Sequence, residues 1–251
     1  YIHQPDERKP GMNAWFGTDF NRHSTWFHSM KSYFDYVRRS CALLQSGHNV
    51  ADIAYFIGED VPKMTGPMVP KLPAGYQYDF INAEVLKDAR VVNGRIVLSS
   101  GADYAILVLP PQKTMRPEML KVLSRLVKQG ASLLGCAPES SPSNRGYPDC
   151  DDRVSQLAAA MWDGMDGISM TERCYGKGHI FCGIGLQEAL NQLDVGPDLI
   201  IPAIPQEILF AHRAGDGFEL YVLSNQSKDS ISGTFGFDVT DRQPELWNAE
   251  T

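Results

Sequence analysis

The chain has 251 residues, of which 43% are apolar and 21% are charged, a composition typical of a folded globular protein. Its formal net charge of −7 argues against nucleic acid or an anionic membrane as a partner. No apolar run approaches the roughly 20 residues that a membrane-spanning helix needs. We therefore expect neither a nucleic-acid partner nor a membrane partner.

The first residue is Tyr1, and the sequence stops abruptly at "PELWNAET". Both ends read as cuts through a longer protein, and the chain carries no signal peptide. Because a fragment need not contain a targeting segment, this absence says nothing about location.

The N-terminal half begins with an irregular segment, 1–24, followed by a helix that Ser24 or Thr25 can cap and Gly47 can close. The next expected elements are, in order, a strand over 49–58, a four-proline loop over 59–78, a short helix over 79–89 capped by Asp79 or Asn82, and a hairpin turning at Asn93-Gly94.

The central part alternates apolar strands with amphipathic helices. Strands over 104–109 and 131–136 are apolar at nearly every position, which is typical of parallel strands buried on both faces. Helices are expected over 116–129, 151–162 and 186–193, and a hairpin over 168–182. This order predicts the α/β class, a doubly wound, mostly parallel sheet flanked by helices over about 49–200.

The pattern changes after Pro205. Two alternating strands surround Gly215-Asp216-Gly217, and "ISGTFGFDV" adds a third with no helix after it. We expect an antiparallel segment here, with too few strands to close a sandwich.

The five cysteines are odd in number and irregularly spaced, and they form no C-x-x-C pair. They are Cys41, Cys136, Cys150, Cys174 and Cys182. We expect no zinc site and mostly buried free thiols, while one disulfide stays open if the parent protein is exported. Cys136 ends a buried strand, but Leu134 and Pro138 are too large for a nucleophile elbow, so a structural role is expected.

Other polar residues favour structural roles. "GEDVPKMTG" is acidic at its start and "GIG" is a lone glycine pair, so no nucleotide or flavin cofactor is expected. His48, His179 and His212 stand alone between apolar segments and are expected to be hydrogen-bonded packing residues rather than metal ligands. Asp149, Asp151 and Asp152 fit helix capping better than calcium binding.

The N-terminal segment "HQPDERKPGMNAWFGTDFNRHSTWF" mixes aromatic faces with hydrogen-bonding groups, as small-molecule pockets do. Trp15 and Phe16 can stack on the C–H face of a sugar ring. His3, Gln4, Asn21 and Arg22 can bind its hydroxyl groups. The residues alone leave open the alternative, in which the aromatic side chains simply pack on the next helix.

This block, together with "VADIAYFIGED", "LPAGYQYDFINAEVL", "YAILVLPP" and "PELWNAET", resembles glycoside hydrolase family 106 over essentially the whole chain. The resemblance implies a (β/α)8 catalytic barrel, then a flavodoxin-like domain, then β-sandwich domains. Residues 1–47 would be the last loop and helix of the barrel, 48–204 the flavodoxin-like domain, and 205–251 the start of a sandwich. The N-terminal block would then be one wall of a site whose other walls lie outside this chain.

The resemblance implies a bacterial α-L-rhamnosidase that acts on plant or microbial polysaccharide side chains. Its acid and base carboxylates would lie outside this chain, so no catalytic residue or metal ligand is assigned here, and calcium would be held mainly by missing residues. We expect an inactive fragment, export of the parent to the periplasm or cell surface, and a homo-oligomer through the flavodoxin-like domain. The alternatives are a non-catalytic interaction module and an exo-glycosidase of different sugar specificity.

Overall fold

The computed structural model describes residues 24–200 and 208–250. The chain divides into two compact units, and each is described by itself. The described part of the smaller unit comprises residues 24–46 and 241–250, and the larger unit begins at Gly47 and ends at Thr240. None of the described helices is both long and apolar enough to cross a bilayer.

The smaller unit contains a 3-10 helix, Phe27–Ser29, followed by α1, Met30–Leu44. The expectation that Ser24 or Thr25 caps α1 is wrong, because the 3-10 turn comes between them and Ser29 occupies the cap position without a side-chain bond. Gly47 does not close the helix either, since Gln45 is the C-cap.

The larger unit is built on a six-stranded sheet with the order β3-β2-β7-β8-β10-β9. Its first five strands are parallel and β9 is antiparallel to β10, so the sheet is mostly parallel, as predicted. Its strands are β2 Ile53–Phe56, β3 Tyr78–Ile81, β7 Ile106–Val108, β8 Ser132–Leu134, β9 Glu172–Tyr175 and β10 Gly178–Phe181.

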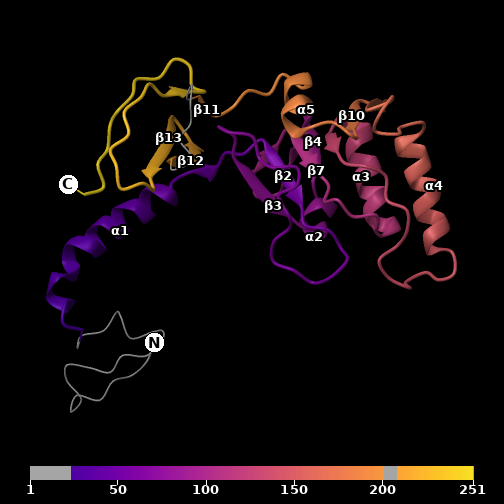
Figure 1. Cartoon of the computed structure of the whole chain (residues 1–251), viewed down its shortest axis with the longest axis horizontal. Helices are drawn as coiled ribbons and strands as arrows, with labels where there is room; N and C mark the ends of the chain where they lie inside the picture. Colours follow the sequence, from indigo (N-terminus) through magenta and orange to yellow (C-terminus); the bar gives the residue numbers. More distant parts are fainter. Residues whose placement is uncertain (1–23, 201–207, 251) are drawn as a thin grey trace, which may run out of the picture. The chain divides into compact units, whose positions relative to one another are not determined.

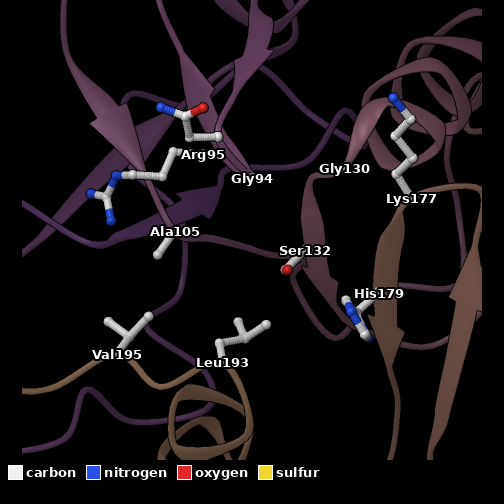
Figure 2. Close-up of a pocket in the computed structure, with 10 residues that line it drawn as sticks. Gly94, Arg95, Ala105, Gly130, Ser132, Lys177, His179, Leu193 and Val195 are labelled. Atoms are coloured by element: carbon white, nitrogen blue, oxygen red, sulfur yellow. The ribbon is translucent and has the colours of Figure 1, made fainter.

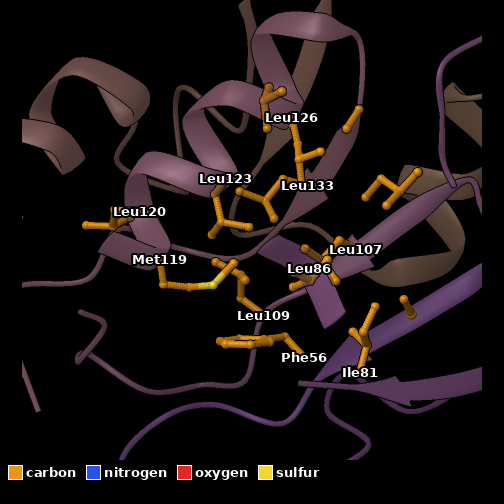
Figure 3. Packing of buried hydrophobic residues seen from close by; sticks show 14 of the residues in the cluster. Phe56, Ile81, Leu86, Leu107, Leu109, Met119, Leu120, Leu123, Leu126 and Leu133 are labelled. Atoms are coloured by element: carbon orange, nitrogen blue, oxygen red, sulfur yellow. The ribbon is translucent and has the colours of Figure 1, made fainter. Parts of the chain in front are cut away.

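Helices cover both faces of this sheet (Figure 1). They are α2 Ala83–Lys87, α3 Pro117–Gln129, α4 Cys150–Trp162 and α5 Leu186–Gln192. Side chains of α2, α3 and α4 share one core cluster with Ala54 and Phe56, whereas α5 shares the other with Ile53 and Tyr55. Successive residues of β2 therefore enter opposite cores, which is why parallel strands need apolar residues at every position. Figure 3 shows α3 packed over Phe56 and Leu107.

One strand of the parallel sheet was not predicted. Tyr78–Ile81 forms β3, whereas the sequence pattern indicated a helix from Asp79. Helix α2 starts only after Asn82, whose side-chain oxygen accepts a hydrogen bond from the Val85 amide at 3.0 Å, so Asn82 is the cap. Asp79 occurs within a strand because its carboxylate accepts hydrogen bonds from Tyr104 at 3.0 Å and Asn49 at 3.2 Å.

The Asn93-Gly94 turn was predicted correctly. Both residues have positive φ, 51° and 82°, as a two-residue hairpin turn between β4 and β5 requires. A short third strand, β6, pairs with β5. This small antiparallel sheet contains β4 Arg90–Val92, β5 Arg95–Val97 and β6 Asp103–Tyr104.

The two strands expected on either side of Gly215-Asp216-Gly217 form the predicted antiparallel hairpin, whereas the third strand pairs outside it. They are β12 Ile208–Gly215, β13 Phe218–Asn225 and β14 Gly236–Phe237. The partner that completes the β12–β13 sheet is β1, His48–Asn49, while β14 pairs with β11, Leu199–Ile200. The expected single strand over 49–58 is therefore two strands, β1 and β2, which belong to different sheets.

Two cysteines form a disulfide, Cys136–Cys182, with their Cα atoms 5.0 Å apart. The expectation of free thiols is wrong at these two positions and right at Cys41, Cys150 and Cys174, but of these three only Cys150 is buried, whereas most were expected to be. The reason lies in the strand order. Cys136 follows β8 and Cys182 follows β10, and these strands are hydrogen-bonded neighbours although the cysteines are 46 residues apart.

Candidate functional site

The six predicted sugar-binding residues lie outside the described part of the chain. They are His3, Gln4, Trp15, Phe16, Asn21 and Arg22. Their assignment stays a prediction. Within the described residues, polar groups come together at several places.

The first place is the carboxyl edge of the parallel sheet, where α/β folds bind ligands between strands that diverge. Glu59, which follows β2, accepts hydrogen bonds from the backbone amide of Arg116 at 3.0 Å and from its Nε at 2.6 Å. The Glu59 side chain is only 5% exposed. An ion pair thus lies at this edge of the sheet, and its acidic member is the buried one.

The second place is a buried histidine on β12. His212 Nδ1 lies 2.9 Å from Asp198 Oδ1, and Nε2 lies 2.9 Å from Glu219 Oε2. Burial alone would lower the pKa of His212, but the hydrogen bonds and charges of Asp198 and Glu219 outweigh it and raise the pKa above its usual value. The imidazole also stacks on Tyr221, with ring centroids 4.0 Å apart. His212 is therefore the hydrogen-bonded packing residue that was predicted.

The third place is a cavity of about 400 Å³ at the amino-terminal edge of the sheet (Figure 2). Its lining includes Ser132 and His179, which lie at the starts of β8 and β10, together with Arg95, Lys177 and Leu193. The residues that line the cavity include no phenylalanine, tyrosine or tryptophan. It therefore lacks the flat apolar wall on which a sugar ring stacks.

The charge of Arg95 is already neutralised at the rim of this cavity. Its Nη1 lies 2.8 Å from Asp52 Oδ1, and its Nε donates to Asp103. Neither the carboxyl edge nor the cavity presents two facing carboxylates of the kind that glycosidases use.

Comparison with known proteins gives the family. The model of glycoside hydrolase family 106, described as alpha-L-rhamnosidase, matches residues 1–251. The chain belongs to glycoside hydrolase family 106.

Two relatives of this family 106 chain differ in their names. A rhamnosidase from Novosphingobium sp. PP1Y, of solved structure, is 35% identical and matches with a TM-score of 0.85 over 98% of this chain and 24% of that one. A protein of Formosa agariphila named "Putative beta-glucuronidase" is 36% identical over 100% of this chain and 21% of its own length. The family 106 chain thus spans about a fifth to a quarter of these relatives.

Sequence reasoning missed one cluster in this family 106 chain. Glu172, Cys174 and His179 each place one potential metal-ligating atom within 4.8 Å of the others. They surround the turn at Gly176; the hairpin itself was predicted, but not the register that places Cys174 opposite His179. The expectation that His179 has no partner side chain at metal-ligand spacing is therefore wrong.

Proposed function

We propose that this chain is part of an α-L-rhamnosidase that acts on side chains of plant or microbial polysaccharides. One observation carries the proposal: the whole chain matches the family model described as alpha-L-rhamnosidase, and 98% of it superposes on a rhamnosidase. Because the chain spans 24% of that rhamnosidase, its own contribution is one binding wall and an accessory region.

Residues 48–204 form a flavodoxin-like domain in this proposal. Numbered along the chain, the five parallel strands β2, β3, β7, β8 and β10 have the spatial order 2-1-3-4-5, which is the flavodoxin-like order. The Glu59–Arg116 ion pair at the strand ends favours an accessory domain without a nucleotide. The alternative is that the domain is a non-catalytic module through which the protein self-associates. Light scattering of the complete protein measures its oligomeric state.

Residues 1–47 form the last loop and helix of a (β/α)8 barrel, and residues 205–251 begin a β-sandwich. The first assignment is supported by α1, whose 15 residues bury only Met30 and leave Tyr36 and Leu44 at least 40% exposed. A helix of a barrel carries such apolar side chains on the face that packs against the strands.

The substrate-binding wall consists of His3, Gln4, Trp15, Phe16, Asn21 and Arg22. Neutral and cationic donors would bind the sugar hydroxyls, and the aromatic faces would stack on the ring. The acid and base carboxylates of the inverting reaction come from the rest of the barrel. If the isolated chain hydrolysed an aryl rhamnoside faster than a heat-killed control, the assignment of both catalytic carboxylates to the rest of the barrel would be wrong.

Calcium in the parent's active site would have to be held elsewhere. Among the described residues, the group that could share an ion is Glu172, Cys174 and His179. It offers one carboxylate, a thiol and an imidazole, whereas calcium takes six to eight oxygen ligands. These residues do not fit calcium.

The sugar is the least constrained part of the proposal, because the two relatives are equally similar and differ in name. The deciding experiment compares the complete protein on an aryl α-L-rhamnoside and an aryl β-D-glucuronide at equal concentration. Preference for the rhamnoside is expected. Preference for the glucuronide would replace the rhamnosidase with an exo-glycosidase of different specificity.

We also infer that the parent protein is exported to the periplasm or cell surface. The disulfide Cys136–Cys182 supports this, since disulfides persist in oxidising compartments and are rare in the cytosol. Fractionation of the source cells tests it, and recovery of the protein in the cytosol with both thiols reduced would contradict it.

A further inference from the structure

Strands β9 and β10 form a hairpin at one edge of the six-stranded sheet. Cys174 and His179 are directly opposite each other across this hairpin, and Glu172 lies two residues before Cys174 on the same face. His179 Nδ1 lies 2.9 Å from Glu172 Oε1 and 3.9 Å from Cys174 Sγ. Three different ligand types thus converge on one point.

The arrangement does not suit a cysteine nucleophile. A Cys-His-Glu triad needs the thiol on one ring nitrogen and the carboxylate on the other, so that a proton can move through the imidazole. Here both partners face Nδ1, and neither contact involves Nε2. The cluster therefore has the wrong connectivity for general-base activation of Cys174.

The same convergence suits a metal ion. Thiolate, imidazole and carboxylate are the ligands that Zn²⁺ accepts, at bond lengths of about 2.0–2.3 Å. Tetrahedral geometry with such bonds separates ligand atoms by about 3.3–3.6 Å. The distances of 2.9 and 3.9 Å bracket this range, so small rotations of the Glu172 and Cys174 side chains would complete the ligand geometry.

The surroundings also allow a cation. Arg173 alternates to the other face of β9, where its Nη1 donates to the backbone carbonyl oxygens of Ala160 and Met161. Glu172 and Cys174 are exposed and His179 is half-buried, so a metal can reach them from solvent. Figure 2 shows His179 on β10 beside Ser132, with Lys177 in the turn that precedes the strand.

We propose that Glu172, Cys174 and His179 form a Zn²⁺ site that fixes the β9–β10 hairpin. The three side chains would supply three of four tetrahedral ligands, and water would take the open fourth position. Because β9 is an edge strand with one paired neighbour, cross-strand ligation would stabilise this edge of the sheet. The site is independent of the proposed glycosidase function.

The test uses the complete protein, freed of metal and with its disulfide intact. Zn²⁺ binding is measured by calorimetry, and Co²⁺ is then used as a spectroscopic probe for a thiolate-to-metal charge-transfer band. The wild type is compared with Cys174→Ser and His179→Asn, and with Cys41→Ser, which removes another exposed free thiol. Circular dichroism verifies that every variant is folded.

The proposal predicts that Cys174→Ser loses one Zn²⁺ equivalent and the cobalt band, whereas Cys41→Ser retains both. His179→Asn should weaken Zn²⁺ binding by at least the roughly 10–100-fold that loss of a supporting residue costs at metal sites. Zn²⁺ should also raise the Tm of the wild type but not of Cys174→Ser. A wild type without a cobalt band in excess metal, or a band that survives in folded Cys174→Ser, would overturn the proposal.

Discussion

His212 and Asp198 form a buried hydrogen-bonded pair whose Nδ1 and Oδ1 atoms lie 2.9 Å apart. The two residues are 5% and 4% exposed. Asp198 lies immediately before β11 and His212 lies on β12, so the pair links two strands of different sheets. Glu219 and Tyr221 of β13 enclose the imidazole from the other side. The imidazole is thus held between two carboxylates, an arrangement that favours its protonated form.

This pair predicts that stability falls as the pH rises. The pKa of folded His212 is raised, so its contribution is fully present below the unfolded pKa of about 6.5 and is lost as the pH rises through the folded pKa. Urea unfolding from pH 6 upward should show this decline in the wild type. Asp198→Asn should make this pH dependence weaker and lower the free energy of unfolding by about 1–3 kcal/mol at pH 6. His48→Gln, on exposed β1, is the control, and an equal flattening there would contradict the assignment.

The disulfide predicts a large stability difference among the cysteines. Cys136→Ser should lower the free energy of unfolding by about 2–4 kcal/mol, because the bond closes a loop between residues 46 apart and restricts the unfolded chain. Cys174→Ser in metal-free buffer removes an exposed free thiol and should change the free energy of unfolding by less than about 0.5 kcal/mol. Equal urea midpoints for the two variants would show that the disulfide is absent or contributes nothing.

A side chain added at Gly178, the first residue of β10, should clash with its surroundings. A Cβ atom there would lie 2.1 Å from the carbonyl oxygen of Ala131 and 2.4 Å from that of Val127. Both obstacles are backbone atoms, so Gly178→Ala should destabilise the chain by at least about 1–3 kcal/mol. Gly233→Ala is the matched control, because nothing lies within 4 Å of its Cβ position and its φ lies outside the left-handed region. Thermal unfolding that ranks the two variants equally would refute the clash.

The elements with strong local signals were predicted correctly. Asn93-Gly94 specifies a hairpin turn by its own backbone preference, and Pro117 and Gly130 mark the two ends of α3. The fully apolar residues 106–108 indicated a strand buried on both faces, because two helical layers exclude water from it.

Features that depend on distant contacts were not predicted. The pairing of His48 with Ala214 joins segments 166 residues apart, and no local pattern specifies it. Asp79 interrupts the apolar run of β3 because a hydrogen bond from Tyr104 satisfies it. The Glu172–His179 pair was missed although the two residues are close in sequence, because only the exact register about the Gly176 turn brings these side chains together.

The buried ion pair of Glu59 and Arg116 should contribute more to the free energy of unfolding than an exposed ion pair does. Glu59→Ala removes the acceptor for two donors of Arg116 and should cost about 1.5–3 kcal/mol. The control is Glu139→Ala, whose ion pair with Lys113 is exposed on both sides and should contribute less than about 1 kcal/mol. Chemical denaturation at neutral pH compares them, and a larger loss for Glu139→Ala would reverse the interpretation.

The last prediction tests the proposed sugar-binding wall in the complete enzyme. Arg22→Ala should reduce kcat/KM on the preferred aryl glycoside by roughly tenfold or more, because one lost charge-assisted hydrogen bond is worth about 1.5–3 kcal/mol. Folding should be nearly unchanged, since a loop side chain contributes little to a core. Arg90→Ala, an exposed arginine of β4, is the control and should leave kcat/KM intact. If Arg22 instead pairs with Asp19 or a neighbouring helix, Arg22→Ala will lower the Tm while kcat/KM per folded enzyme stays constant. Measuring Tm and kcat/KM on the same preparations separates the two roles, and an unchanged kcat/KM removes Arg22 from the site.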